Sequence, residues 1–368
     1  MMRSGYTIGT LIALAVCAVL HAGCIRASSV AEGGTGNAKP LPTEADIKEK
    51  LLLAAPATSA VALKLERQII SKSEEGGVFV LPVSMAFSAD GGIYISDNTR
   101  HAIHYCSPNS NTLYTMPPQS GVGNIRAPTT IHLRQENIFV SDRDGIKVLK
   151  RDGSFQRLLR IYYGIFHFAI APDGAIYINP FFARPEASNP LIVKLDGEGT
   201  RVSSFGQRLD RPNHDGLDDR AYLFATRTLL IAAFVCRPAI QIYDRSKGEL
   251  IREVRIEHPI FGTLEALGDD PKYLHPRPGV TALPRFTAGM CVADGNIFVL
   301  LHLPKPEIVE FDLEGNEKGR YRLDGLPVAI TYFGFDVRRV EDKYRFTIGV
   351  IDAGSVPTLA ECTLAAVR

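Results

Sequence analysis

From about Val61 to the C-terminus, short apolar runs alternate with turn residues, and one order of runs and turns recurs along the chain. In the repeated unit an apolar run leads to a tight turn, which contains Asp-Gly or Gly-Asn in several copies. The turn is followed by a second run of aliphatic and aromatic residues. A connection then leads to a third run, which ends near an aspartate. Such runs, bounded by glycine-containing turns, are typical of strands joined as hairpins. The pattern therefore predicts an all-β chain built from a repeated antiparallel unit.

Five copies of the unit can be aligned. Their second runs are Ile93–Asp97, Ile138–Asp142, Ile176–Asn179, Leu229–Ala232 and Ile297–Leu300, and their third runs are Ile103–Tyr105, Ile146–Leu149, Leu191–Gly197, Ile240–Asp244 and Ile308–Asp312. A sixth copy, formed by Tyr332–Val337, Tyr344–Ile351 and Leu359–Leu364, lacks a fourth strand. The segment Val61–Ile70 alternates like a strand and belongs to no copy, so it can supply the missing one. Closure of this kind removes an exposed sheet edge. We therefore expect residues 61–368 to form a six-bladed β-propeller of four-stranded antiparallel blades, closed by an N-terminal strand.

The N-terminus has the pattern of a signal peptide, predicted over residues 1–23. Arg3 precedes the uncharged apolar run Ile8–Leu20, which is too short to cross a bilayer. The sequence Leu20-His21-Ala22-Gly23-Cys24 resembles a bacterial lipobox, although His21 stands where an aliphatic residue is usual. The resemblance implies that Cys24 is lipidated, with ordinary secretion as the alternative. The following stretch is rich in Ala, Ser, Gly and charged residues, so residues 24–60 are predicted to be a tether. The expected location is the cell envelope, facing the periplasm or the exterior, with the membrane contacted through the lipid anchor only.

Charge and cysteine content narrow the choice of partners. The 41 basic and 40 acidic residues nearly cancel, so nucleic acid is not an expected partner.

Besides Cys17 and Cys24 the chain has Cys106, Cys236, Cys291 and Cys362, at spacings that fit no metal motif. We expect four free, buried thiols. If one disulfide forms, Cys236 and Cys291 are the first pair to consider, because they lie on successive repeats.

The repeat resembles that of NHL-type six-bladed propellers. The resemblance rests on Asp-Gly, a short aliphatic-aromatic strand, Ser-Asp, and Ile-x-x-Tyr, and it covers residues 61–368. Family repeats usually place an arginine directly before the third strand. This chain has Ala102, Gly145, Pro190, Ala239 and Glu307 at those positions. The resemblance implies the fold, together with functions that range from scaffolding to hydrolysis.

The connections predict which face of the ring binds ligands. In a four-stranded blade, the turns joining strands one to two and three to four lie on one face, and here they are tight. The opposite face would carry the long connections Phe181–Pro190, Gln207–Arg220 and His258–Arg285. Long loops concentrate on functional surfaces. We call this predicted binding surface the long-loop face.

One cation recurs on the long-loop face. Arg100, Arg143, Arg237 and Lys305 each stand three residues before the aliphatic start of a third strand, and Arg184 lies in the longer loop of the third copy. The sixth copy has Val356 instead. Because blades are related by rotation, we expect these cations to form a rim around the channel mouth. This rim would bind an anionic small molecule, a glycan or an envelope protein. The alternative is that each cation pairs with a neighbouring aspartate, such as Asp97 or Asp142, and joins blades.

No catalytic constellation can be assigned, so the catalytic residues stay unknown and no cofactor is expected. Gluconolactonase-type propellers resemble this architecture and imply a divalent metal held by Glu, Asn and Asp at the channel. Here the first strands are mostly apolar, which leaves Asn179, Asp336, His132 and His167 as isolated candidates. The segment 210–219 resembles a calcium loop, but Arg211 and Tyr222 occupy its first and twelfth positions. The sequence therefore favours a binding or scaffold module, with a metal-dependent hydrolase or lyase as the alternative.

Overall fold

A computed structural model gives the structure. It describes residues 60–70, 81–88, 90–108, 113–181, 190–208, 219–262, 285–303, 305–323, 326, 329–340, 342–352 and 357–364. The signal segment, Cys24 and the tether as far as residue 59 lie outside the described residues, as does Arg184.

Four sheets each contain four antiparallel strands in chain order. They are β2 (Pro82–Phe87), β3 (Ile93–Asp97), β4 (Ala102–Cys106) and β5 (Leu113–Thr115); β6 (Ile131–Arg134), β7 (Asn137–Asp142), β8 (Gly145–Lys150) and β9 (Phe155–Arg160); β10 (Gly164–Ile170), β11 (Ile176–Phe181), β12 (Ile192–Leu195) and β13 (Arg201–Phe205); and β14 (Ala221–Ala225), β15 (Leu229–Phe234), β16 (Ala239–Asp244) and β17 (Leu250–Arg255). A 3-10 turn, η1 (Gly121–Gly123), lies between β5 and β6.

The fifth sheet has eight strands and joins the two ends of the chain. Its members are β18 (Thr287–Ala293), β19 (Asn296–Leu301), β20 (Glu307–Asp312), β21 (Glu317–Leu323), β1 (Val61–Ile70), β24 (Pro357–Leu364), β23 (Lys343–Asp352) and β22 (Ala329–Val340). β1 runs parallel to β21 and antiparallel to β24. The predicted strand Val61–Ile70 therefore forms and covers an edge of β24 that would otherwise be open.

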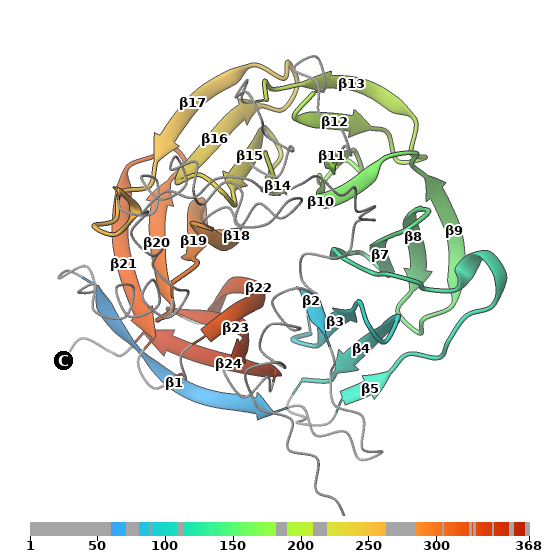
Figure 1. Cartoon of the computed structure of the whole chain (residues 1–368), viewed down its shortest axis with the longest axis horizontal. Coiled ribbons are helices and arrows are strands. Elements are labelled where there is room, and N and C mark those ends of the chain that lie inside the picture. The colour runs from blue at the N-terminus through green and yellow to red at the C-terminus, as the bar shows by residue number, and fades with distance from the viewer. Residues whose placement is uncertain are drawn as a thin grey trace, which may run out of the picture.

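The sheets are arranged around a common centre (Figure 1). The first strands, such as β10, β14 and β18, lie nearest the centre, and the fourth strands, such as β13 and β17, lie at the periphery. This order explains the burial pattern, because β15 is almost wholly buried whereas five of the six residues of β17 are exposed.

Apolar side chains between neighbouring sheets form the core. Six clusters of buried hydrophobic residues are present among the described residues. Five join successive sheets, for example Phe168 with Ile146 between β10–β13 and β6–β9. The sixth lies inside the eight-stranded sheet, where Phe298 packs with Phe346. The two halves of that sheet therefore face each other across a core of their own.

Tight turns connect first to second strands, as the sequence predicts. Asp294 and Gly295 join β18 to β19 with φ values of 49° and 77°. Two successive positive φ angles are the signature of a type I′ hairpin turn, which glycine accepts without steric cost.

The predicted second and third runs of all five copies correspond to strands, whereas the expected fourth strands of these copies could not be assigned residue ranges from the sequence. The four described cysteines are thiols rather than members of a disulfide, as expected, so the alternative pairing of Cys236 with Cys291 does not form. Three of the thiols are buried as predicted, whereas Cys236 is only partly buried. Within the described residues no helix has the length and hydropathy needed to cross a membrane.

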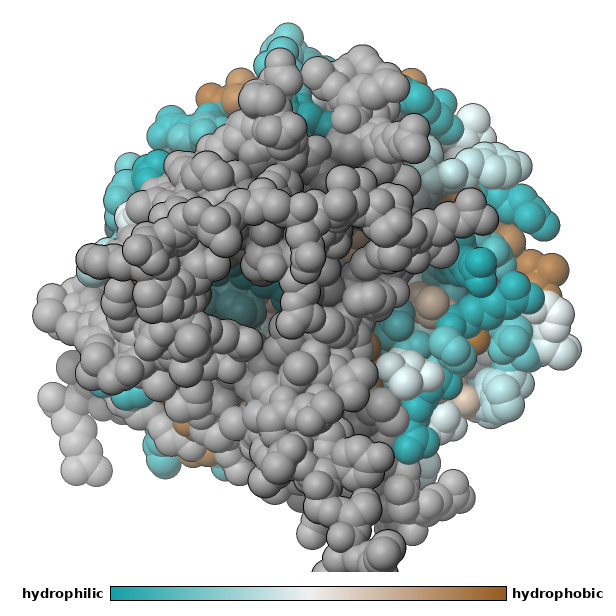
Figure 2. All heavy atoms as spheres, in the orientation of Figure 1, coloured by the Kyte–Doolittle hydropathy of each residue, from teal (hydrophilic) through white to brown (hydrophobic). Residues whose placement is uncertain are grey.

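Figure 2 shows that the described surface on one face is mainly hydrophilic, with separate apolar patches near the edge of the ring. Exposed apolar side chains such as Tyr114, Tyr162 and Leu250 belong to different parts of the ring. Such scattered groups are normal for a protein surface.

Candidate functional site

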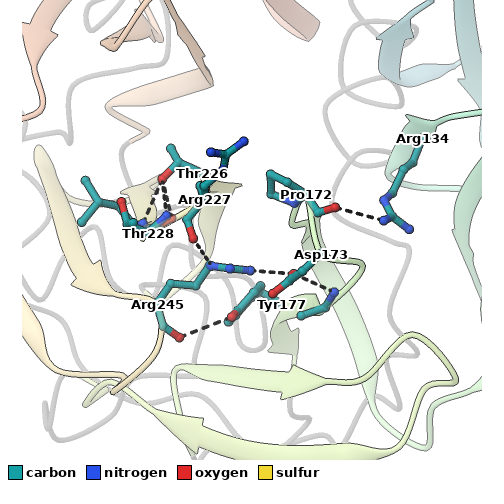
Figure 3. A network of polar contacts seen from close by, with 10 residues as sticks. Arg134, Pro172, Asp173, Tyr177, Thr226, Arg227, Thr228 and Arg245 are labelled. Carbon is teal, nitrogen blue, oxygen red and sulfur yellow. Dashed lines mark hydrogen bonds and ion pairs between the residues drawn. The ribbon is translucent and has the colours of Figure 1, made fainter.

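The face of tight turns carries a polar network that joins three sheets (Figure 3). Arg245, after β16, lies 2.7 Å from the carboxylate of Asp173 in the β10–β11 turn and donates to the carbonyl of Arg227 at 3.1 Å. Arg134, at the end of β6, donates to the carbonyl of Pro172. Each contact ties a turn to its neighbour, so this network stabilises the ring on the side where the turns are shortest.

The predicted rim cations occupy one topological position. Arg100, Arg143, Arg237 and Lys305 each lie in a connection between the second and third strands of a sheet. Arg100, Arg143 and Lys305 are exposed, whereas Arg237 is half-buried.

The neighbouring aspartates are engaged mainly by backbone groups. Asp97 accepts hydrogen bonds from the N–H groups of Leu81 and Arg100. Asp142 accepts from the N–H of Ala127 and of Arg143, and it pairs with Lys147 at 2.5 Å. Asp97 also lies 3.9 Å from Nε2 of His104, so backbone N–H groups, His104 and Lys147 are among the groups that contact these two carboxylates.

Arg237 differs from the other rim cations. Its guanidinium lies 3.3 Å from the centre of the Phe234 ring and 4.0 Å from the carboxylate of Glu253. Stacking on an aromatic face is a favoured arginine contact. These contacts of the side chain lie within its own sheet, to an aromatic ring and a glutamate.

The four metal candidates do not form a ligand set among the described residues, although two of them, His132 and His167, contact each other. The side-chain amide of Asn179 donates to the carbonyls of Leu191 and Asp219 and accepts from the N–H of Ala221, which joins two sheets. Asp336 pairs with Arg338 at 3.2 Å. In the described part of the chain no three His, Cys, Asp or Glu side chains gather as metal ligands would. Most of the calcium-like segment lies outside the described residues.

A row of aromatic side chains follows three successive first strands. The ring of His132 on β6 lies 5.6 Å from that of His167 on β10, and His167 lies 5.4 Å from the ring of Tyr222 on β14. Burial lowers the pKa of His132 to about 4 and that of His167 well below its usual value. Both imidazoles are therefore neutral at pH 7, and His167 accepts from the N–H of Leu223 through Nδ1.

Two arginines at the inner edge of the ring were missed by the sequence reasoning. Arg220 directly precedes β14, and Arg285 lies two residues before β18, at the strand ends that face the long connections. Backbone hydrogen bonds join Val235 to Arg220 and to Phe286, the residue that follows Arg285. The predicted cations share a repeat position, whereas these two arginines stand at different offsets from their strands and carry no periodic signal.

No family model matches the chain, and no curated protein matches it by sequence. Solved structures do resemble it. A protein from Bacteroides fragilis for which export is inferred matches with a TM-score of 0.55 at 11% identity, over 82% of this chain and 95% of that chain. The chain is a propeller-like all-β protein. The luciferin-regenerating enzyme matches this propeller with a TM-score of 0.52 at 10% identity, over 82% and 96% of the two chains. Streptogramin B lyase matches with a TM-score of 0.48 at 15% identity, over 80% and 86%.

Proposed function

We propose that the chain is an extracytoplasmic six-bladed propeller of the NHL-like type. Six hydrophobic clusters support six blades, because each cluster fills the space between two packed sheet faces. The eight-stranded sheet then represents two blades, β18–β21 and β22–β24, with β1 as the fourth strand of the second. In this proposal Cys24 carries a lipid that holds the propeller at the cell envelope through the tether of residues 24–60.

We infer that the propeller is a binding module whose long-loop face takes an anionic small molecule, a glycan or an envelope protein. The supporting observation is the shared placement of Arg100, Arg143 and Lys305. All three are exposed between second and third strands. Backbone N–H groups and Lys147 contact the aspartates beside Arg100 and Arg143. Arginine suits this role because its planar fork contacts carboxylates and phosphates at two points. Arg184 and Arg237 are the other members of the proposed rim.

Retention on immobilised polygalacturonate tests this function. Arg100, Arg143 and Lys305 are replaced together by Gln, and the matched control replaces Lys150, Arg201 and Arg227, three exposed cations beside the tight turns. Since both variants lose three charges, only the position differs. We expect roughly tenfold weaker binding for the rim variant, because an exposed charge contact contributes up to about 1 kcal/mol. Equal loss in both variants would contradict the proposed face. Turnover of a lactone panel that depends on added metal would instead favour the hydrolase alternative.

A further inference from the structure

Backbone contacts hold three arginines of the β6–β9 sheet close together on the long-loop face. The carboxylate of Asp142 accepts hydrogen bonds from the N–H of Arg126 at 3.1 Å and from that of Arg143 at 2.7 Å. Gly145 pairs with Arg160 across β8 and β9. A Cβ atom on Gly145 would lie 3.2 Å from the Cα atom of Arg160, so the two strands approach closely there. We call Arg126, Arg143 and Arg160 the arginine stripe.

The stripe runs outward across a single sheet. Arg143 lies in the connection between β7 and β8, and Arg160 is the last residue of β9, the fourth strand of that sheet. β9 lies at the periphery of the ring, outside β7 and β8 (Figure 1). The predicted rim, by contrast, passes around the ring from one sheet to the next. The stripe therefore suits an extended ligand that crosses the sheet, rather than a small molecule at the channel mouth.

The positive charge of the stripe is exposed and only partly neutralised. All three side chains are exposed, and among the described residues none of them takes part in a hydrogen bond, an ion pair or a ring contact. Asp142 belongs to the buried ion pair with Lys147, so its charge is compensated below the surface. The exposed carboxylate of Asp144 lies next to Arg143 in the chain. Three guanidinium groups and this one carboxylate leave two positive charges, which attract an anionic ligand.

The equivalent positions of the β14–β17 sheet show what arginines do there when they serve the fold. Arg237 stands at the repeat position of Arg143, and its guanidinium stacks on an aromatic ring. Arg255 stands at the repeat position of Arg160, and it lies 3.4 Å from the carboxylate of Glu257. Both arginines of that sheet therefore have partners within the chain. The stripe has the same topology without such partners, so the repeat alone does not account for its charges.

An exposed aromatic ring stands beside the outer end of the stripe. Tyr162 follows Arg160 by two residues and is 92% exposed. The backbone nitrogen of Ile161 would lie 2.9 Å from a Cβ atom on Gly145, so Tyr162 leaves the sheet at the same strand end as the stripe. A single exposed aromatic residue is ordinary on a protein surface. Next to a row of cations, however, its flat apolar face and polar hydroxyl match the C–H face and hydroxyl groups of a sugar ring.

We propose that the arginine stripe and Tyr162 bind an extended polysaccharide that carries carboxylate groups. The guanidinium groups contact successive carboxylates of the polymer, and Tyr162 packs against one of its sugar rings. Single-stranded nucleic acid is less well matched, because its bases stack on a series of aromatic rings, and the described stripe has one exposed ring. The proposal rests on the proposed function, since it names the polymer class and its path across the long-loop face.

Chain length and charge of the glycan give the first test. Calorimetry compares galacturonate, polygalacturonate and fully methyl-esterified polygalacturonate, which has the same sugars without their charge. We expect polygalacturonate to bind about tenfold or more tightly than the monomer, because several contacts act together, and the ester to bind far more weakly. Equal affinity for monomer and polymer, or for ester and acid, would overturn the proposal. Tighter binding of polydeoxythymidylate at equal salt would assign the stripe to nucleic acid instead.

Paired substitutions then locate the site. Arg126→Gln with Arg160→Gln should weaken polygalacturonate binding by about tenfold. The matched control is Arg201→Gln with Arg255→Gln, two exposed arginines on the fourth strands of other sheets, and it should change binding by less than about twofold. Unfolding temperatures of both variants are measured, so that a folding defect is recognised. Equal weakening in the two folded variants would mean that overall charge, and not the stripe, binds the polymer.

Two further substitutions predict opposite effects at the same place. Asp144→Asn should strengthen polygalacturonate binding by about two- to fivefold, because it removes the carboxylate that opposes the ligand. A folding defect cannot imitate such a gain. Tyr162→Ala should weaken binding by about fivefold, whereas Tyr162→Phe should retain most of it, since the ring remains. Unchanged or weaker binding by Asp144→Asn would contradict the proposed path of the polymer.

Arg143 belongs to both the rim and the stripe, so the variants that distinguish them leave it in place. Arg100→Gln with Lys305→Gln removes rim charges only, and Arg126→Gln with Arg160→Gln removes stripe charges only. Weaker polygalacturonate binding in the stripe variant alone would mean that the rim fails and the stripe stands. Weaker binding in the rim variant alone would overturn the stripe and leave the proposed function in place. Unchanged binding in both variants would overturn both.

Discussion

Lys147 and Asp142 form an ion pair at 2.5 Å, and both side chains are almost completely shielded from solvent. The pair also anchors the connection that leads to β6. Asp142 accepts from the N–H groups of Arg126 and Ala127, and Lys147 donates to the carbonyl of Asn124. One buried carboxylate therefore joins the end of β7 to a loop on the same side of the ring as the rim cations.

Replacing Lys147 by Met should destabilise the protein by about 3–5 kcal/mol, because Asp142 would keep a buried charge without its cation. Urea unfolding at pH 7 measures the change. Lys150→Met, an exposed position on the same strand, is the control and should alter stability by less than about 0.5 kcal/mol. Similar effects at both positions would show that the ion pair does not stabilise the fold as argued.

The same pair predicts acid sensitivity. Burial alone would raise the pKa of Asp142, but hydrogen bonds from Lys147 and from backbone N–H groups outweigh it and hold the pKa below its ordinary value. A lowered pKa contributes stability that is present above the unfolded-state pKa, near 4, and is lost as the pH falls through the folded-state pKa. The stability difference between the native protein and Lys147→Met should therefore shrink below pH 4. A difference that stays constant down to the lowest pH at which both proteins fold would contradict this linkage.

The pairing of β1 with β24 makes stability depend on the N-terminal strand. Leu63 is 3% exposed and belongs to the core between the two halves of the eight-stranded sheet. Leu63→Ala should lower the free energy of unfolding by about 2–5 kcal/mol, through lost burial and the cavity left behind. Lys64→Ala, whose side chain is exposed on the same strand, should have little effect. Equal denaturation midpoints for Leu63→Ala and Lys64→Ala would count against closure of the ring by β1.

The polar network in Figure 3 should contribute less to the stability of the fold than the buried groups Lys147 and Leu63 do. Arg245 is mostly covered, but the carboxylate of Asp173 that it contacts is 58% exposed, and exposed ion pairs contribute at most about 1 kcal/mol. We expect a double-mutant cycle with Arg245→Ala and Asp173→Ala to give a coupling below about 1 kcal/mol, reduced in 1 M salt. A coupling of several kcal/mol, or one unaffected by salt, would mean that the pair behaves as a buried one.

The sequence was sufficient to predict where the buried strands lie in the chain. β3, β7, β11, β15 and β19 are second strands with both faces in the core, so they appear as continuous apolar runs. The fourth strands were expected but could not be located in the sequence, because they lie at the periphery. Residues such as Arg252 on β17 need no apolar pattern to pair with β16.

The site was harder to predict for a similar reason. The rim cations recur at one repeat position, and periodicity reveals them. Arg220 and Arg285 come together through backbone bonds between different sheets, and no spacing in the sequence reports that contact. Arg237 illustrates the converse, since its repeat position matches the rim while its guanidinium stacks on Phe234. Periodicity therefore predicts where a residue lies in the topology, and packing decides what it touches.

Asp336 lies on the innermost strand of its sheet. It should make the stability of the fold depend on pH with the opposite sign to the dependence caused by Asp142. Burial raises its pKa to about 6, despite the guanidinium of Arg338 at 3.2 Å. A raised carboxyl pKa means that folding favours the protonated form. Its contribution to stability is complete below the unfolded-state pKa, near 4, and is lost as the pH rises through 6.

Asp336→Asn keeps the shape of the side chain and removes its charge. Relative to the native protein, this variant should gain about 1–3 kcal/mol in unfolding free energy between pH 4 and pH 7. The lower half of that range is expected, because a quarter of the Asp336 side chain reaches solvent and screens the charge. Urea unfolding at pH 4, 5, 6 and 7 follows the difference. Asp342→Asn, at a fully exposed carboxylate just beyond the same strand, should show no such trend. If the Asp336→Asn difference were flat across this range, the carboxyl group would titrate as an ordinary surface aspartate, and its burial would not control its charge.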